Sequence, residues 1–426
     1  KPTVCGEGHR GIVSGWGEAT GSGFAMLLGD AGDLELWVGD GNAVFDRVST
    51  GIPLLPHQWA FVAVSVDLVE GSAILLQRPE RRWPGVDSWA TCCVAVACRA
   101  VGDADVPLLV AAIGRADAPG HYFDGKIEAP VLRRRALSSA ELNMSSEVGI
   151  TSPPPDDVIA AWDFSVGIHT RNVTDQSSNG FHGVLVNMPA RAVTGCRWTG
   201  HQTDWTQAPE QYAAIHFHSD DLEDAGWDTD LVVPIDETYP SGVYAVRLRA
   251  GDCEDRIPFV VRPGRNSPRA RIAVLLPTLT YQAYANSRVF GGSAAKIEQA
   301  EDEYMSQHGL RGLYDYHRDG SPSYYASRLQ PSTNRPNYYA QHLAAPARLS
   351  SDLCLIDWLM EQDIEHDIIT DEDLHHEGAD LLRHYRVVIT GSHPEYWTEH
   401  MGVAMEEYLN QAGNLAYLGG DGCYWV

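Results

Sequence analysis

Cysteine, long apolar runs and positive charge are all scarce in this sequence of 426 residues. Its 8 Cys are too few to hold a small fold together with disulfides, and their spacing matches no zinc-binding pattern, so we expect free thiols and a cytoplasmic protein. No run approaches the roughly 20 apolar residues of a membrane helix, so we expect no membrane span. The 31 Lys and Arg against 57 Asp and Glu give a net charge of −26, which disfavours nucleic acid and anionic membranes as partners. Such acidity suits a halotolerant protein, because salt screens the repulsion between its charges.

The composition that is present belongs to a folded, turn-rich protein. Apolar residues make up 44% of the chain, and 40 Gly and 24 Pro supply many turns. At roughly 100–200 residues per domain, the length predicts two to four domains. The sequence starts without Met and stops directly after a strand-like run, so we expect a fragment of a longer protein.

Residues 1–200 predict short antiparallel strands. Apolar residues recur at 58–66 and at 72–76, and turn residues separate such segments, which is typical of a β-sandwich. Residues 161–165 and 175–183 together resemble the opening strand of laminin-G-like, concanavalin-type jelly rolls. We therefore expect a lectin-like β jelly roll over 1–200, a module that serves many different functions.

Residues 201–268 predict a small second β unit. Residues 242–248 alternate apolar and polar side chains, and 257–261 close the unit, so we expect a small immunoglobulin-like β-sandwich here. His216 and His218 lie at alternate positions of a strand and so share one face. We expect that face to be exposed surface.

The pattern changes at residue 269. From there, short apolar runs alternate with segments of helical periodicity, as in an α/β domain with a parallel sheet. The strand-like runs are 272–276, 364–369, 387–389 and 415–418, and the helical segments are 349–360, 374–383 and 401–412. We expect a Rossmann-like, doubly wound α/β domain over 269–426, with ligands binding beyond the carboxyl ends of its strands.

Tyrosines gather in the connection that follows the first of these strands. The connection between 276 and 349 is far longer than the usual length of roughly 2–6 residues, and a loop that long is usually functional. It holds nine of the chain's 18 Tyr: Tyr281, Tyr284, Tyr304, Tyr314, Tyr316, Tyr324, Tyr325, Tyr338 and Tyr339. Each ring could simply pack on apolar surface. A buried phenol nevertheless needs a partner, and a hard trivalent cation can bind it as phenolate.

Two further strand ends carry reactive side chains. His393 and Glu395 flank Pro394, so one could ligate a metal while the other acts beside it; alternatively, Glu395 caps the helix that follows. Cys423 follows the last strand in a Gly-Asp-Gly-Cys turn that resembles the nucleophile turn of α/β hydrolases and class I amidotransferase-like domains, with His393 as its base. Cys423 could equally be a small buried residue.

Three motifs carry a resemblance to a known family: Leu276–Asn286, Gly391–Trp397 and Gly419–Trp425. Together with the jelly roll, the small β unit and the α/β domain, they resemble the large (beta) subunit of N,N-dimethylformamidase over nearly the whole chain. The family's large subunit is longer, so the resemblance implies that this chain is an interior fragment of such a subunit.

The resemblance implies a mononuclear Fe³⁺ held by two tyrosine phenolates and one glutamate carboxylate. Carried over to this sequence, the carboxylate is that of Glu395 and one phenolate is that of Tyr314. Tyr281 is taken as the second phenolate, with Tyr284 as the alternative. Three anionic oxygens match the hardness of a ferric ion and offset its charge.

The implied reaction is hydrolysis of N,N-dimethylformamide, a small amide, to dimethylamine and formate by metal-activated water. His393 would carry the proton to the leaving amine, and Asp421 stands where the family has an Asn that orients substrate or water. The family works as a hetero-oligomer of large and small subunits, which favours the jelly roll as an assembly surface. Two alternatives stay open: a hydrolase with Cys423 as nucleophile, and a carbohydrate-binding protein acting through 1–200.

Overall fold

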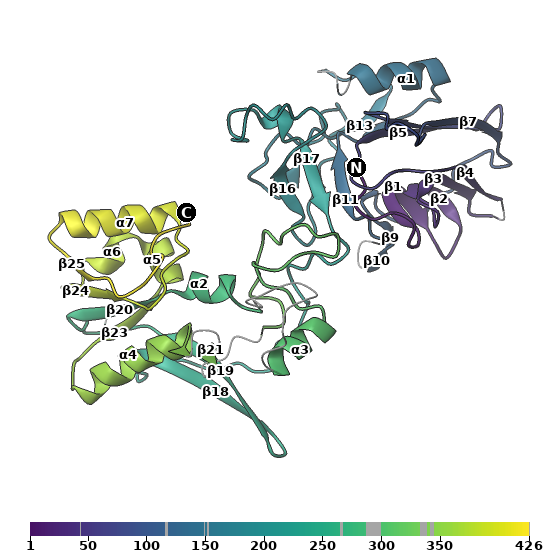
Figure 1. Ribbon diagram of the computed structural model, residues 1–426. Helices are drawn as coiled ribbons and strands as arrows, with labels where there is room; N and C mark the ends of the chain where they lie inside the picture. Colours follow the sequence, from purple (N-terminus) through teal and green to yellow (C-terminus); the bar gives the residue numbers. More distant parts are fainter. Residues whose placement is uncertain are drawn as a thin grey trace. The chain divides into compact units, whose positions relative to one another are not determined.

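The computed structural model describes residues 1–42, 44–115, 118–148, 150, 153–264, 267–286, 300–332, 339–340 and 345–425. The chain divides into two compact units. The first unit comprises Lys1–Glu223 with His317–Gly320, and the second comprises Asp224–Tyr316 with Ser321–Val426. Strands outnumber helices (Figure 1), in agreement with the expectation of a β-rich protein with more than one domain.

The first unit contains two larger antiparallel sheets (Figure 1). One has the order β4-β3-β2-β1-β8, with the bounds β1 Arg10–Gly17, β2 Ser22–Leu28, β3 Asp33–Asp40, β4 Phe45–Pro53 and β8 Leu109–Val110. The other has the order β5-β6-β7, with the bounds β5 Ala60–Asp67, β6 Ser72–Pro79 and β7 Ala90–Ala95. Leu28 and Leu36 of the first sheet share one core with Ala73 and Leu75 of the second. The strands predicted near 58–66 and 72–76 are confirmed as the β5–β6 hairpin.

A three-stranded sheet with the order β11-β17-β16 completes the main framework of this unit, with the bounds β11 Gly125–Glu128, β16 Ala190–Val193 and β17 Ala214–Phe217. Smaller pairs and one helix surround it: β9 Ile113–Arg115 with β10 Ala118–Gly120, β12 Val131–Arg133 with β13 Val158–Ala161, β14 Asn172–Val173 with β15 Gly183–Val184, the helix α1 Ser139–Val148, and a short 3₁₀ turn at Pro209–Gln211.

His216 of β17 and His218, which follows this strand, are buried and not exposed as expected. His216 is 5% exposed and His218 is 6% exposed, so the prediction of an exposed face is wrong. β17 is the central strand of its sheet, and the side chain of Asp319 lies against both rings. Asp319 belongs to His317–Gly320, the distant segment that is part of this unit. The alternation of residues along a strand cannot predict that a segment distant in sequence will cover one of its faces.

The second unit is built on a parallel sheet with the order β23-β20-β24-β25, with the bounds β20 Ile272–Leu276, β23 Asp367–Thr370, β24 Val387–Thr390 and β25 Asn414–Ala416. Its helices are α2 Thr278–Ala283, α3 Ala300–Gln307, α4 Leu349–Glu361, α5 Asp371–Glu377, α6 Ala379–Leu382 and α7 Glu399–Asn410. The expected alternation of strands and helices is present from β23 to β25.

The continuous apolar run of β20 is buried on both faces of this sheet. Ala273 and Leu275 pack in one core with residues of α5, α6 and α7, whereas Val274 and Leu276 pack in another with residues of α4. Figure 1 shows α4 on one side of the sheet and the other three helices on the opposite side. Successive strand residues point to opposite faces, so a strand covered on both sides must be apolar at every position.

Residues 201–268 form no separate sandwich among the described residues. β17 lies in the sheet of the first unit, whereas β18 Gly242–Ala250 and β19 Cys253–Val261 form a hairpin of the second unit. Val243 and Val260 of the hairpin pack on the core that contains Val274. A two-stranded hairpin cannot bury a core of its own, which explains why it packs on the core of the α/β sheet.

A short pair of strands, β21 Tyr339–Ala340 and β22 Ala345–Pro346, completes the described elements. None of the helices in the described residues is long and apolar enough to cross a lipid bilayer.

Candidate functional site

The second unit brings three strand ends together at one edge of its parallel sheet. β20 continues into α2, β24 continues into 391–397, and β25 continues into 417–425. The last two segments are hydrogen-bonded to each other: the main-chain oxygen of Glu395 accepts the N–H groups of Tyr424 and Trp425, both at 3.1 Å. These three segments, together with Tyr314 from the connection after α3, form the candidate site.

The carboxylate of Glu395 is the centre of the site. The hydroxyl of Tyr284 donates to its Oε2 at 2.7 Å, and the hydroxyl of Tyr314 donates to its Oε1 at 3.1 Å. Nε2 of His393 lies 2.9 Å from the same Oε2. Glu395 is only 5% exposed, so this carboxyl group is buried and is hydrogen-bonded to two phenols and an imidazole.

Helix α2 positions both the turn and one of the phenols. The hydroxyl of Thr280, a buried residue of α2, accepts the N–H of Glu395 at 3.1 Å and that of Tyr396 at 3.2 Å. Tyr284 is the residue at which α2 ends, so its ring leaves the helix toward the turn that the helix holds. One short helix thus fixes the carboxylate and a phenol relative to each other.

Tyr281 is held elsewhere. It lies within α2, is buried in the core that contains Val274, and donates its hydroxyl hydrogen bond to Asp352 of α4. The same carboxylate accepts the N–H of Ser392 at 2.6 Å. Tyr281 therefore links α2, α4 and the turn after β24. Tyr284, the alternative to Tyr281 as the second phenolate, is the residue whose hydroxyl contacts Glu395.

The phenols of the site are protonated when no cation is bound. Burial, and after it the hydrogen bond to Glu395, raises the pKa of Tyr284 above its usual range. Burial, and after it the hydrogen bond with Tyr284, raises the pKa of Tyr314 in the same way. A cation that takes the place of these protons would receive oxygen ligands only, which is the donor type that hard metal ions prefer.

Asp421 and Cys423 lie in the turn after β25. Oδ2 of Asp421 is 4.0 Å from Nε2 of His393, so this exposed carboxylate stands beside the imidazole. Cys423 has a left-handed φ of 55°, as in a sharp turn. Desolvation raises the pKa of its thiol, however, whereas a catalytic cysteine needs a lowered one. The raised pKa therefore does not favour Cys423 as a nucleophile.

The family model described as "N,N-dimethylformamidase beta subunit-like, C-terminal" matches residues 190–426. The chain belongs to this family. It is 36% identical over 454 residues to the N,N-dimethylformamidase beta subunit of Paracoccus aminophilus, and 35% identical over 454 residues to that of an Alcaligenes species. Each alignment covers 100% of this chain, and the chain spans 59% of the length of these relatives.

The structure also places most of the other tyrosines in the long connection that follows β20. Four of them are exposed: Tyr304, Tyr316, Tyr324 and Tyr325. Tyr338 lies outside the described residues, and Tyr339 is in β21. Tyr396, which was not predicted as a site residue, also belongs to the group, because its hydroxyl is 2.6 Å from that of Tyr314. Tyr396 follows Glu395 directly in the sequence, and this adjacency could have predicted that it belongs to the site.

Proposed function

We propose that this chain carries the catalytic site of an amidohydrolase that cleaves N,N-dimethylformamide and similar small formamides to dimethylamine and formate. Both relatives are named N,N-dimethylformamidase beta subunits. The strongest support from the chain itself is that Tyr284 and Tyr314 converge on the buried carboxylate of Glu395 at the carboxyl edge of the parallel sheet. That edge is where α/β sheets bind their ligands.

The donor set fits a mononuclear Fe³⁺. Tyr284, Tyr314 and Glu395 offer three oxygens that become anions when the phenol protons leave, and three negative charges offset the charge of a ferric ion. Tyr284 takes the role given to Tyr281, because the hydroxyl of Tyr281 is bonded to Asp352. A ferric ion bound there would supply the Lewis acidity that polarises a formamide oxygen and lowers the pKa of water.

His393 is placed to move a proton. Its imidazole is partly exposed, its Nε2 contacts Glu395, and its ring meets the edge of the Tyr284 ring. The nitrogen of a tertiary amide is a poor leaving group until it is protonated, so an imidazole at the rim can deliver that proton. The exposed carboxylate of Asp421 lies 4.0 Å from the same nitrogen, next to the place proposed for the proton transfer.

The wider setting belongs to the same proposal. The name "beta subunit" of both relatives implies another subunit, so we infer a hetero-oligomer with a small subunit. We also infer that the two sheets with a shared core form the expected laminin-G-like jelly roll, and that the parallel sheet with helices on both faces is Rossmann- and amidotransferase-like. The cytoplasmic location and the tolerance of salt stay predictions from composition.

The test is metal analysis of the full-length enzyme purified with its small subunit. The wild type should contain about one iron per site and show the visible tyrosinate-to-iron absorption, and Tyr314→Phe should lose both together with formamide hydrolysis. Tyr316→Phe is the matched control, because Tyr316 is exposed and lies outside the group.

Iron at wild-type level in Tyr314→Phe would contradict the proposed centre. Loss of activity on thiol alkylation with the iron intact would instead support the Cys423 hydrolase. A metal-free protein that binds glycans would support the carbohydrate-binding alternative.

A further inference from the structure

The first unit contains a second cluster of metal-binding side chains, independent of the proposed iron site. His216 belongs to β17 and His218 follows it directly, while Asp319 comes from the segment His317–Gly320 of the same unit. Positions 216 and 319 are 103 residues apart in the sequence. A sequence pattern at one of these places cannot reveal the other, which explains why the cluster was not predicted.

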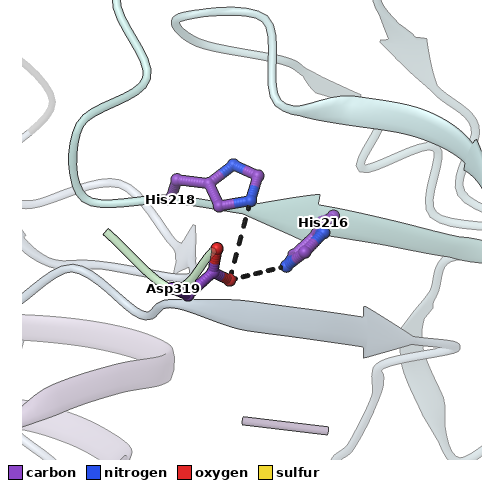
Figure 2. Close-up of side chains that lie close together, drawn as sticks. All are labelled: His216, His218 and Asp319. Carbon is purple, nitrogen blue, oxygen red and sulfur yellow. Dashed lines mark hydrogen bonds and ion pairs between the residues drawn. The ribbon is translucent and has the colours of Figure 1, made fainter. Parts of the chain in front are cut away.

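Two imidazole nitrogens converge on one carboxylate oxygen, as Figure 2 shows. Nε2 of His216 lies 3.2 Å from Oδ2 of Asp319, and Nε2 of His218 lies 3.9 Å from the same oxygen. The ligand atoms of the three residues all lie within 4.8 Å of one another. The side chains of His218 and Asp319 are each 1% exposed. The three donors therefore face one another in a nearly dry place.

These separations are those of ligands around one metal ion. An ion about 2.0–2.1 Å from each of its ligands in a tetrahedral arrangement keeps the ligand atoms about 3.3 Å apart. The two measured distances lie on either side of that value. A hydrogen bond accounts for the shorter distance, but 3.9 Å is too long for one. A shared cation accounts for both.

The other ring nitrogen of His218 is held by a second carboxylate. Nδ1 of His218 lies 3.2 Å from Oδ1 of Asp221, and the main-chain N–H of His218 donates to Oδ2 of Asp221 at 3.0 Å. A proton on Nδ1 shared with Asp221 leaves a lone pair on Nε2, the nitrogen that faces Asp319. A carboxylate behind a metal-binding histidine is the usual arrangement in metal sites, because it fixes the tautomer and the ring orientation.

His317 supports the same ring. Its imidazole stacks on that of His218, with ring centres 3.7 Å apart and planes 4° from parallel. Its Nδ1 lies 2.7 Å from Oδ1 of Asp220. His218, Asp221 and His317 could also form a metal site, but Asp221 already accepts two hydrogen bonds from His218. His317 and Asp221 therefore act as positioning residues.

We propose that His216, His218 and Asp319 bind a divalent transition-metal ion of the zinc class. Two imidazoles and one carboxylate are ligands that suit Zn²⁺ and its neighbours, and they differ in kind from the three oxygen ligands proposed for Fe³⁺. Because the site is buried, its role is structural: the ion joins β17 to a segment 103 residues further along the chain. Only the folded chain brings the three ligands together, so ion binding stabilises the fold.

The experiment uses the full-length enzyme, depleted of weakly held metal with a chelator and then titrated with Zn²⁺ alone. The expected result is about one zinc per chain in addition to iron, and a higher Tm with Zn²⁺ than without. His218→Gln and Asp319→Asn should each weaken zinc binding at least about 100-fold while the iron content stays at the wild-type level. His201→Gln, an exposed histidine of the same unit, should bind zinc as the wild type does. Asp221→Asn should cost about 10–100-fold.

Two measurements keep the proposal testable if a variant fails to fold. Wild-type protein loaded with Co²⁺ should show the visible absorption of a cobalt ion bound by nitrogen and oxygen, and the Zn²⁺ effect on Tm needs no variant. No zinc beyond iron and no change in Tm would overturn the site, as would normal zinc binding by Asp319→Asn. Loss of zinc in His317→Gln but not in His216→Gln would overturn this choice of ligands.

Discussion

The hydroxyl of Tyr284 donates to the carboxylate of Glu395 at 2.7 Å across 111 positions of the sequence. One residue ends a helix that follows β20, and the other lies in the turn after β24, the strand that pairs with β20. Adjacent parallel strands thus bring a phenol and a carboxylate to the same sheet edge. Four predictions follow from the way these groups are held.

Replacing Tyr284 and Tyr281 one at a time by Phe tests which of them binds iron and which only stabilises the fold. Tyr284→Phe should remove most of the bound iron, because one of the three oxygens at the centre is lost. Tyr281→Phe should keep its iron but lower the free energy of unfolding by about 1–3 kcal/mol, because buried Asp352 loses a donor. Iron content and thermal unfolding of the same samples measure both effects. Loss of iron in Tyr281→Phe alone would restore Tyr281 as the ligand.

His393→Gln should leave the iron content unchanged and lower kcat by about 10²–10⁴-fold, the usual contribution of a positioned general acid or base. His384→Gln is the matched control, since His384 is an exposed histidine of the same unit. A variant at position 393 with wild-type kcat would show that the proton comes from another group.

Thr280→Val should destabilise the turn that carries Glu395. The threonine hydroxyl accepts two main-chain N–H groups there, and valine leaves both without that partner at a cost of about 1–3 kcal/mol each. We expect a lower Tm and weaker iron binding, measured by competition with a chelator. Thr280→Ser keeps the oxygen and should rescue both properties; failure of serine to rescue would mean that the methyl group matters more.

Asp371 should make the stability of the second unit fall as pH rises. Burial raises the pKa of this carboxyl well above its usual range, and its Oδ2 accepts the N–H of Leu279 at 3.1 Å. The folded chain then holds a proton that the unfolded chain releases, so this stabilisation is complete below the ordinary Asp pKa and is lost as pH rises through the raised one. Asp371→Asn cannot ionise and should show a smaller decline in denaturant unfolding between pH 4 and about pH 8. An unchanged pH dependence in the variant would show that Asp371 is ionised in the fold.

The sequence predicts the parts of this protein that depend on local pattern. The runs at 272–276 and 387–389 become adjacent parallel strands, and the motifs after them meet at one edge, because parallel order forces their carboxyl ends together. Periodicity does not say which of two tyrosines three residues apart turns to the carboxylate. That choice depends on Asp352, which takes the hydroxyl of Tyr281 and lies 71 positions away.

The errors have the same physical origin. The hairpin of β18 and β19 alternates like a sandwich strand pair, but its apolar side chains pack on the α/β sheet and not on a core of their own. His216 and His218 have the spacing of an exposed strand face, but Asp319 lies against them from a distant segment. In each case the residues that determine the packing are distant in sequence, so a local pattern cannot predict them.

Glu395 is fastened at its main chain on both sides, with its N–H on Thr280 and its carbonyl oxygen on the N–H groups of Tyr424 and Trp425. The conformational entropy cost of orienting Glu395 therefore arises when the chain folds and not when a ligand binds. If the proposed iron binds there, a centre preorganised in this way should take it up with little rearrangement and release it slowly.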